Sequence, residues 1–233
     1  MFCFIDYRTS SYEKEILNSL DLSIIEVPRY PNLYEAIDGH VDIQINILDK
    51  ISKKILINKD IDTTFKNNLK NLNISYIDSK NFLKEVYPNN ISLNAFSIGN
   101  YFVHNLKYTD ENLLFYNKDK ILINVKQGYT KCSCLPVSDN AFITSDVGIY
   151  KALSKYNLDI LLLPPGDIVL EGLNYGFIGG TGGLITPDTM AFFGDLKFYK
   201  YGEEVKKFLS KYNVKPIYLK ESKLTDRGSL LVL

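Results

Sequence analysis

The sequence predicts an α/β fold in which one helix-plus-strand unit is repeated five times. Three segments show the unit best: EKEILNSLDLSIIEVP, GIYKALSKYNLDILLLPP and EEVKKFLSKYNVKPIYL. Each reads as a helix of about three turns, a polar connection and a short apolar strand. Further strands begin at intervals of 56, 36, 48 and 50 residues, near Asp38, Asn94, Thr130, Ile178 and Gly228. The many tight hairpins disfavour the competing architecture, a doubly wound parallel sheet.

The first half of the chain supplies the elements in a regular order. Apolar residues at helical spacing predict a helix after Ser10 and Ser11, and they are Tyr12, Ile16, Leu17 and Leu20. A strand, LSIIEVP, follows and ends at a proline. The alternating stretch IDGHVDIQINI and the short KKILINK predict two strands, TTFKNNLKNL predicts a helix and NISYID another strand.

The second half repeats this order. Two strands are expected around Gly99 in ISLNAFSIGNYFVHN, and the segment ENLLFYNKDKILINV follows them. Strands in CSCLPVSDNAFITSD precede the helix VGIYKALSKY and the strand LDILLLPP. The last elements are YGFIGGTGGLI, MAFFGDL, the helix GEEVKKFLSKY, and the strands VKPIYLK and GSLLVL.

Composition and charge exclude several classes of function. The chain has 233 residues, enough for a substantial core, and we expect one domain over residues 1–233. Lys and Arg number 27, as do Asp and Glu, so no charge excess attracts nucleic acid or an anionic membrane. No apolar run is long enough to span a bilayer, and the first residues do not resemble a signal peptide. Three cysteines and two histidines indicate a cytoplasmic protein with free thiols, no structural metal site and no cofactor.

Residues 176–183, GFIGGTGG, contain five glycines. A phosphate-binding loop would place its glycines between a strand and a helix. Here the sequence after Gly183 reads as strand, turn and strand, and no GK[ST] follows. We therefore interpret these glycines as positions where backbones approach closely.

The order and wording of several segments resemble the pentein, or guanidine-modifying, superfamily. Its members are five-bladed α/β propellers that include arginine deiminases, amidinotransferases and dimethylarginine dimethylaminohydrolases. In chain order, the segments that resemble the five blades are LSIIEVP…AIDGHVDIQI, SIGNYFVHNLKYTD, VKQGYTKCSCLPVSDNAFI, LLLPPGDIVLEGLNYGFIGGTGGLI and LTDRGSLLVL. The chain resembles still more closely an uncharacterised group with this fold. The resemblance implies a propeller whose first strands crowd round a central axis.

The resemblance also implies a site chemistry that this chain does not carry in full. In the superfamily's enzymes two carboxylates hold a guanidinium group, a cysteine attacks the guanidine carbon and a histidine moves protons. Asp38 and Asp42 are the counterparts of the carboxylates. The family histidine falls at or beside Thr130 and the family cysteine at or beside Ser229, so the usual cysteine mechanism does not carry over.

Other residues could serve instead. If residues 38–42 are extended, Asp38, His40 and Asp42 share one strand face directed at the axis. On the same assumption Thr130, Cys132 and Cys134 share a face, so Cys132 could meet His40. A further alternative is a triad of Ser229, Asp226 and His40. We expect His104 at the surface.

The predicted site can be stated residue by residue. The candidate catalytic residues are His40, Cys132 and Ser229. The candidate ligand-binding residues are Asp38, Asp42, Thr130, Gly179, Gly180, Thr181, Asp226 and Arg227. Either Arg8 or Arg227 could neutralise the two carboxylates from within the protein.

Three functions remain open at this point. One is an axial polar cavity that binds a small nitrogenous molecule, guanidino or amino-acid-like, in a protein whose catalytic Cys and His are replaced. The alternatives are an active hydrolase or amidinotransferase-like enzyme with a relocated nucleophile, and a non-catalytic pentein that binds a macromolecular partner. The sequence does not indicate an oligomeric state.

Overall fold

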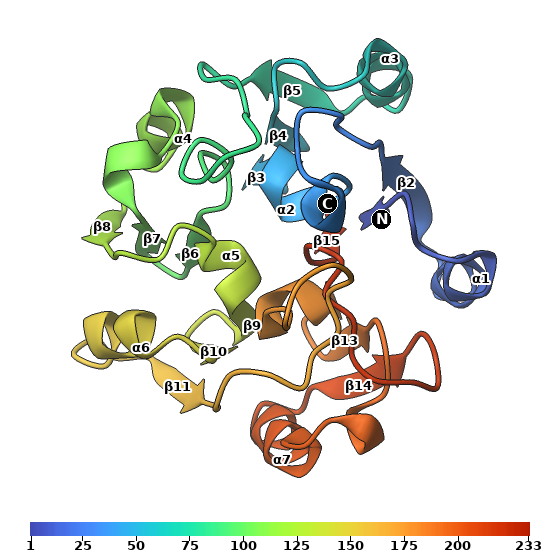
Figure 1. Cartoon of the computed structure of the whole chain (residues 1–233), viewed down its shortest axis with the longest axis vertical. Helices are drawn as coiled ribbons and strands as arrows, with labels where there is room; N and C mark the ends of the chain where they lie inside the picture. The colour runs from blue at the N-terminus through green and yellow to red at the C-terminus, as the bar shows by residue number, and fades with distance from the viewer.

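A computed structural model describes all residues, 1–233, as a mixed α/β protein built from five three-stranded sheets. The sheets stand around a common centre, with one long helix outside each of them (Figure 1). In every sheet the strand nearest the centre is antiparallel to the middle strand, and the middle strand is parallel to the outer one. The repeated unit is therefore a hairpin followed by a helix and a strand parallel to the second strand of the hairpin, in the order that the sequence predicts.

The strands fall into three groups by their distance from the centre. The inner strands are β3 (Ile45–Asp49), β6 (Phe96–Ile98), β9 (Cys134–Ser138), β12 (Gly182–Thr186) and β15 (Leu231–Val232). The middle strands are β1 (Phe2–Asp6), β4 (Lys54–Ile57), β7 (Tyr101–His104), β10 (Ala141–Thr144) and β13 (Thr189–Phe192). The outer strands are β2 (Ser23–Val27), β5 (Ser75–Asp78), β8 (Ile121–Asn124), β11 (Asp159–Leu162) and β14 (Lys215–Tyr218).

The helices are of two kinds. Those that connect middle to outer strands are α1 (Ser11–Asn18), α3 (Thr63–Asn71), α4 (Glu111–Tyr116), α6 (Val147–Leu153) and α7 (Gly202–Lys211). The short ones are α2 (Val41–Gln44), α5 (Thr130–Ser133), η1 (Glu35–Ile37), η2 (Leu106–Tyr108), η3 (Ile178–Thr181) and η4 (Leu196–Phe198). Side-chain caps begin four of the connecting helices, and Ser10 with Glu13 forms a capping box on α1. Tyr12, expected on the buried face of α1, is exposed, whereas Glu13 of the capping box is buried.

The hydrophobic core is divided among the gaps between neighbouring sheets. Each of five buried clusters contains residues from two adjacent sheets, such as Ile25 with Ile55, Leu56 with Phe102, Phe96 with Phe142, Ile143 with Phe192, and Ile5 with Ala191. The last of these clusters packs the sheet of β13 against the sheet that contains both ends of the chain, in which β15 pairs with β1. Burial of apolar area therefore holds each sheet to its two neighbours.

Two segments differ from the expected strands. Residues 41–44 and 130–133 form the helical turns α2 and α5 immediately before β3 and β9. In a helical turn, alternate residues do not share a face. The predictions that Asp38, His40 and Asp42 point the same way because they lie on a strand, and that Thr130, Cys132 and Cys134 do so, are wrong.

The glycine-rich segment confirms the close-packing interpretation. It forms the turn η3 and then enters β12, with no helix after it. A Cβ added to Gly182 would lie 2.0 Å from the carbonyl oxygen of Ala191, and one added to Gly183 would lie 2.1 Å from that of Leu230. Backbone from β13 and from the segment before β15 occupies the space that a side chain would need.

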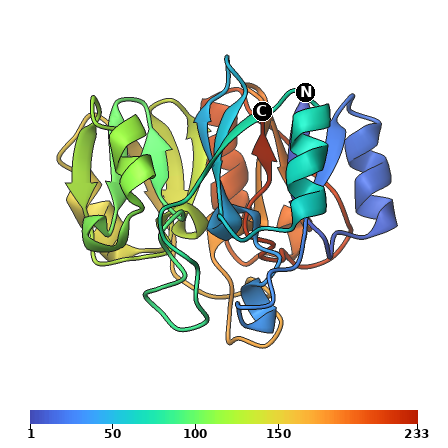
Figure 2. The same cartoon turned by 90° about the horizontal axis from the view of Figure 1, so that it is seen from above.

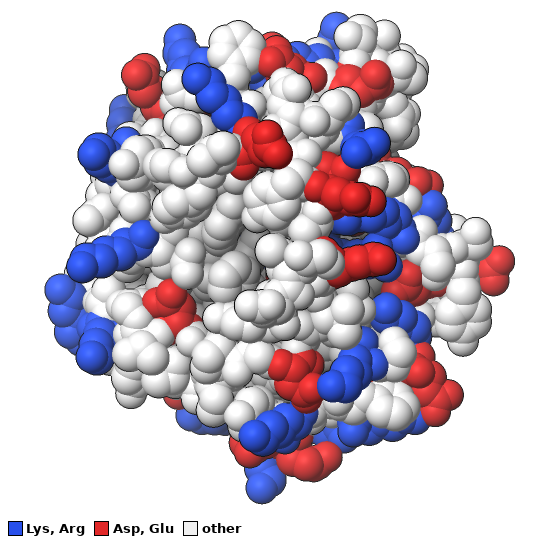
Figure 3. Space-filling view, in the orientation of Figure 1, with Lys and Arg blue, Asp and Glu red and all other residues white.

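The two ends of the inner strands differ in their surroundings. The N- and C-termini lie at one face of the molecule, and the loops at residues 79–92 and 163–177 project with η1 from the opposite face (Figure 2). On the loop face, charged side chains gather along the rim and leave the hollowed middle largely uncharged (Figure 3). No helix combines the length and apolar character that crossing a bilayer requires.

His104 is buried, not at the surface as expected. Its Nε2–H donates to the carbonyl oxygen of Gly128 at 2.9 Å, and its Nδ1 pairs with the hydroxyl of Thr109 at 2.7 Å. Burial lowers the pKa of His104 from 6.5 to about 4. The residue is a neutral core histidine that fastens the loop after β8 to β7.

This pKa predicts a loss of stability in mild acid. Between pH 6.5 and 4 the unfolded chain binds a proton at His104 that the folded chain excludes, so stability falls as the pH falls through this window. Between about pH 7 and 4.5 the wild type should lose about 2–3 kcal/mol more unfolding free energy than His104→Asn. Urea unfolding of both proteins at the two pH values measures this difference. Equal losses in the two proteins would show that His104 does not titrate in this way.

Candidate functional site

Five segments meet at the centre of the molecule, each just before an inner strand. They contain Asp42, Asn94, Cys132, Gly179 and Ser229, and all five residues are buried. The segments come from α2, the turn before β6, α5, η3 and the turn before β15 (Figure 1). The fold thus brings together residues that are far apart in sequence.

Asn94 joins the first three of these segments. Its side-chain Nδ2 donates to the backbone oxygen of Asp42 at 3.1 Å and to the carboxylate Oδ1 at 3.0 Å. Its Oδ1 accepts from the backbone N–H groups of Lys131, at 2.9 Å, and Cys132, at 3.2 Å. The hydroxyl of Thr130 donates to the Asn94 carbonyl at 2.8 Å. A single amide therefore fixes α2 and α5 relative to each other.

The last two segments close the ring of contacts. Gly179 lies against α5 so closely that a Cβ would be 2.4 Å from the carbonyl oxygen of Lys131. Gly180 accepts through its carbonyl from the backbone N–H groups of Arg227 and Ser229, at 2.9 and 3.1 Å. The carbonyl of Gly228 then accepts from the backbone N–H of Asp42 at 3.0 Å. Each segment thus contacts the next, and the fifth contacts the first.

The carboxylate of Asp42 lies at the centre of this ring. The hydroxyl of Ser229 is 2.6 Å from Oδ2, and the thiol of Cys132 is 3.0 and 3.1 Å from the two carboxylate oxygens. The ammonium group of Lys131 donates to the Ser229 hydroxyl at 2.8 Å. Lys131 therefore compensates the charge of Asp42 through one intervening hydroxyl, and neither Arg8 nor Arg227 pairs with Asp42.

The surroundings of Cys132 make it a poor nucleophile. Burial raises its pKa well above the ordinary value, and the charges of Asp42 and Asp226 together with the hydrogen bond to Asp42 raise it further. The thiol donates its proton to a carboxylate instead of being activated by a base. Because the thiolate is the reactive form, the arrangement protects Cys132 from nucleophilic chemistry.

His40 and Asp226 lie beside Asp42. Neither ring nitrogen of His40 has a hydrogen-bond partner, although only 1% of the residue is exposed. Its Nε2 is 3.9 Å from Oδ1 of Asp226. Asp226 accepts from the backbone N–H groups of Phe177, at 2.8 Å, and Gly228, at 2.9 Å. Burial raises the pKa of Asp226, and His40 opposes this shift.

Asp38 belongs to a separate network. Its carboxylate accepts from Nε of Arg29 at 2.6 Å and from the hydroxyl of Tyr7 at 3.2 Å, and Nη1 of Arg8 is 3.9 Å away. The residue is followed by Gly39, where a Cβ would lie 2.6 Å from Oδ1 of Asp6. The predicted pair of Asp38 and Asp42 is thus divided, because α2 turns Asp42 toward Cys132.

The remaining predicted residues have structural contacts at the same centre. The hydroxyl of Thr130 also donates to the carbonyl of Val103, at 3.0 Å, and that of Thr181 donates to the carbonyl of Ile178, at 2.7 Å. Gly180 approaches Asp226 so closely that a Cβ would lie 1.8 Å from its Oδ1. Nε of Arg227 is buried without a partner, and the residue forms no ion pair.

Sequence reasoning missed Asn94 and Lys131 as members of the site. The sequence predicts Asn94 only as the start of a repeat, and Lys131 lies between two predicted residues in TKC. The repeat spacing could have indicated both, since each lies two or three residues before an inner strand. Their side-chain contacts depend on segments 37 to 98 residues away and leave no local signal.

A cap of apolar and aromatic residues covers the cluster on the loop face. Buried residues of the loops and of η1 pack together, and they include Tyr30, Leu33, Ile37, Leu83 and Leu170. Tyr34 and Tyr129 pack against them. Burial raises the pKa of both tyrosine hydroxyls, so both remain protonated near neutral pH.

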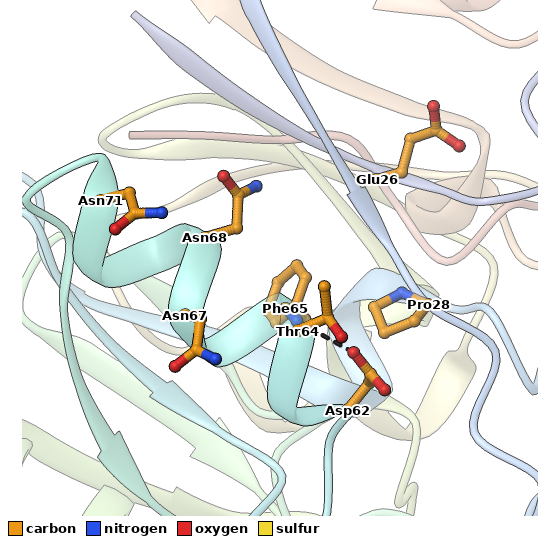
Figure 4. Close-up of a pocket in the computed structure, with 8 residues that line it drawn as sticks. All are labelled: Glu26, Pro28, Asp62, Thr64, Phe65, Asn67, Asn68 and Asn71. Atoms are coloured by element: carbon orange, nitrogen blue, oxygen red, sulfur yellow. Dashed lines mark hydrogen bonds between the residues drawn. The ribbon is translucent and has the colours of Figure 1, made fainter.

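Two concave regions lie apart from the carboxylate of Asp42. One, of about 760 Å³, is lined by the inner strands and the chain termini, and Lys131 reaches its wall from α5. The other, of about 480 Å³, is a surface depression between β2 and α3 with Asp62, Asn67, Asn68 and Asn71 on its wall (Figure 4). Asp62 is the N-cap of α3, and the central cluster contributes nothing to this depression.

Comparisons with known proteins give one family and one similar solved structure. The sequence matches a family of unknown function (DUF6873) over residues 4–231. No curated protein matches significantly. Among solved structures the chain is similar to SxtG, an amidinotransferase of the saxitoxin biosynthetic pathway from Microseira wollei, with a TM-score of 0.54 and 11% identity over 92% of this chain and 73% of that one. At this identity the similarity supports an amidinotransferase-like fold.

The ring of contacts predicts strong coupling between Ser229 and Lys131. Ser229→Ala leaves one oxygen of Asp42 and the Lys131 ammonium without their shared partner, and should cost about 1–3 kcal/mol of unfolding free energy. Lys131→Met should cost a similar amount, and the double variant should be less destabilised than the sum by at least about 0.5 kcal/mol. Urea unfolding measures the cycle, with Ser138→Ala as the control, because the Ser138 hydroxyl forms only an exposed hydrogen-bonded contact with Asn140. Strict additivity would contradict the network.

Proposed function

We propose that this protein, which belongs to the family of unknown function DUF6873, binds a small nitrogenous molecule at its centre. In this proposal the five sheets are the blades of a pentein-type α/β propeller that forms one domain. The ligand is an amino or guanidino compound. One observation carries the proposal: two carboxylates, Asp42 and Asp226, are buried beside a histidine that has no hydrogen-bond partner.

The charges of the cluster favour a cationic or donor-rich ligand. Buried carboxylates lose their hydration, so cations or hydrogen-bond donors must replace it. Lys131 reaches Asp42 only through Ser229, and no Lys or Arg side chain forms an ion pair with Asp226, whose Oδ1 is 3.9 Å from Nε2 of His40. An ammonium or guanidinium group would donate to Asp226 and Asp42 with charge-assisted hydrogen bonds.

Covalent amidine chemistry is less well supported. The resemblance places Thr130 and Ser229 at or beside the positions of the superfamily's catalytic histidine and cysteine, and burial raises the pKa of the Cys132 thiol well above its ordinary value. SxtG is an amidinotransferase, but at 11% identity the similarity supports a shared fold and gives no support for a shared activity. Binding without amidino transfer therefore fits the residues present.

A specific contact favours a second candidate, an enzyme with Ser229 as a relocated nucleophile. The hydroxyl of Ser229 lies 2.8 Å from Nζ of Lys131, a distance suited to proton transfer. A lysine acts as a base only when it is neutral, however. In the structure Lys131 donates to this hydroxyl, and the hydroxyl in turn donates to Asp42 at 2.6 Å, so we rank this candidate below ligand binding.

The proposal predicts no appreciable deiminase or amidinotransferase activity on arginine, agmatine or methylated arginine. Loss of the general acid–base group alone removes a factor of about 10² to 10⁴, and the nucleophile is lost with it. Citrulline and ornithine assays measure the activity. Robust turnover that Cys132→Ala or Ser229→Ala abolishes would replace the binding proposal with the enzyme one.

Ligand binding should appear as thermal stabilisation. A ligand that binds only the folded state raises its stability by about 2.7 kcal/mol at one hundred times its dissociation constant. Screening of amines, amino acids and guanidino compounds by thermal shift should therefore give a stabilising compound. Asp42→Asn and Asp226→Asn should lose the shift.

Asp38→Asn is the matched control for this screen. It also removes a buried carboxylate, but one that Arg29 and Tyr7 already satisfy, so the ligand-dependent shift should persist. A broad screen without a stabilising compound, or equal loss of the shift in all three variants, would contradict the proposal.

A further inference from the structure

We infer that His40, Asp42 and Cys132 form a binding site for a divalent transition-metal ion, with zinc as the best match. The three residues are buried, and their donor atoms all lie within 4.8 Å of one another. His40 and Asp42 come from the segment before β3, and Cys132 comes from α5. The inference goes beyond the proposed function and does not depend on the identity of the nitrogenous ligand.

The donor set suits zinc. Zinc binds imidazole nitrogen, carboxylate oxygen and thiolate sulfur at about 2.0–2.3 Å, and sites with three protein ligands keep a fourth position open. Tetrahedral geometry with such bonds places neighbouring donor atoms about 3.3–3.8 Å apart. The sulfur of Cys132 is 3.0 and 3.1 Å from the oxygens of Asp42, so a small movement of either side chain opens the required space.

His40 provides a second, independent observation. A buried polar group without a hydrogen bond costs free energy, and native proteins satisfy nearly all of them. Both nitrogens of His40 lack a partner, and Gly228 packs against the ring so closely that a Cβ would be 2.4 Å from Cβ of His40. A metal ion on Nδ1 would satisfy that nitrogen and leave Nε2–H facing Asp226, 3.9 Å away.

The neighbouring residues are arranged as supports for metal ligands. Ser229 donates to Oδ2 of Asp42 at 2.6 Å, and Asn94 donates to Oδ1 at 3.0 Å. Nδ2 of Asn94 also lies 3.3 Å from the sulfur of Cys132. Hydrogen bonds of this kind orient ligands and strengthen metal binding. A dication would also balance a thiolate and a carboxylate in a place without other direct countercharge.

Metal analysis and cobalt spectroscopy test the inference without any organic ligand. Protein without a histidine tag, purified without chelators from cells supplied with Zn²⁺, should contain about one zinc per chain. Protein from cells supplied with Co²⁺ should show the charge-transfer absorption of a cobalt–thiolate bond. His40→Gln and Cys132→Ser should each lower the affinity for the metal at least about tenfold, since loss of even an outer-shell partner of a ligand costs about that much.

Cys134→Ser and His104→Asn are the matched controls. Both replace a buried residue of the same type that does not belong to the cluster, and both should keep the metal and the absorption band. Circular dichroism confirms that each variant is folded. Wild-type protein with neither stoichiometric zinc nor a cobalt–thiolate band overturns the inference, even if variants of the cluster do not fold. So does equal metal loss in Cys132→Ser and Cys134→Ser.

The test for a metal ion and the test for a nitrogenous ligand can succeed or fail independently. Ligand screening in the presence and absence of a chelator shows whether nitrogenous compounds bind without the ion. Stoichiometric metal without any stabilising amine would sustain this inference and reject the proposed function, and the reverse result would do the opposite.

Discussion

The hydrogen bond between Ser229 and Asp42 joins residues 187 positions apart, and the centre of the molecule depends on it. It lies in a ring of contacts in which each of five segments touches the next. Apolar burial between neighbouring sheets is non-directional, so it does not by itself fix the position of each inner strand along the central axis relative to the strands beside it. The directional contacts at Asp42 do, because a hydrogen bond weakens steeply when its geometry is lost.

The same junctions separate polar from apolar side chains. A helical turn before β3 and before β9 rotates the chain, so Asp42 and Cys132 face the centre while Ile45 and Leu135 enter the cores between sheets. The cost of burying the carboxylate is offset by the amide, thiol and hydroxyl donors around it. The fold thereby creates a polar centre inside an apolar body, which requires every member of the network to be present.

The repeat could be predicted because each unit carries its own local pattern. The spacing placed Asn94, Thr130 and Gly228 within a few residues of an inner strand, and local patterning predicted the connecting helices α1, α3, α6 and α7 but not α4. The direction of side chains at the junctions could not be predicted in this way. Alternation in DGHVD indicates a strand, but tertiary contacts impose a turn, and Arg29 takes Asp38 away from the centre. Asn94 and Lys131 act only through distant segments, so no local signal marks them.

The contacts that disfavour covalent chemistry at Cys132 are the ones that favour a metal ion there. A thiol that donates to a carboxylate holds its proton tightly and is unreactive, because attack requires the thiolate. A divalent ion would take the place of that proton. The thiolate and the carboxylate, which repel each other, would then both be attracted to the ion. His40 has no hydrogen-bond partner when the proton lies between Cys132 and Asp42, and it would gain a partner in the ion. The cluster is therefore better suited to hold a cation between its residues than to attack a substrate with any one of them.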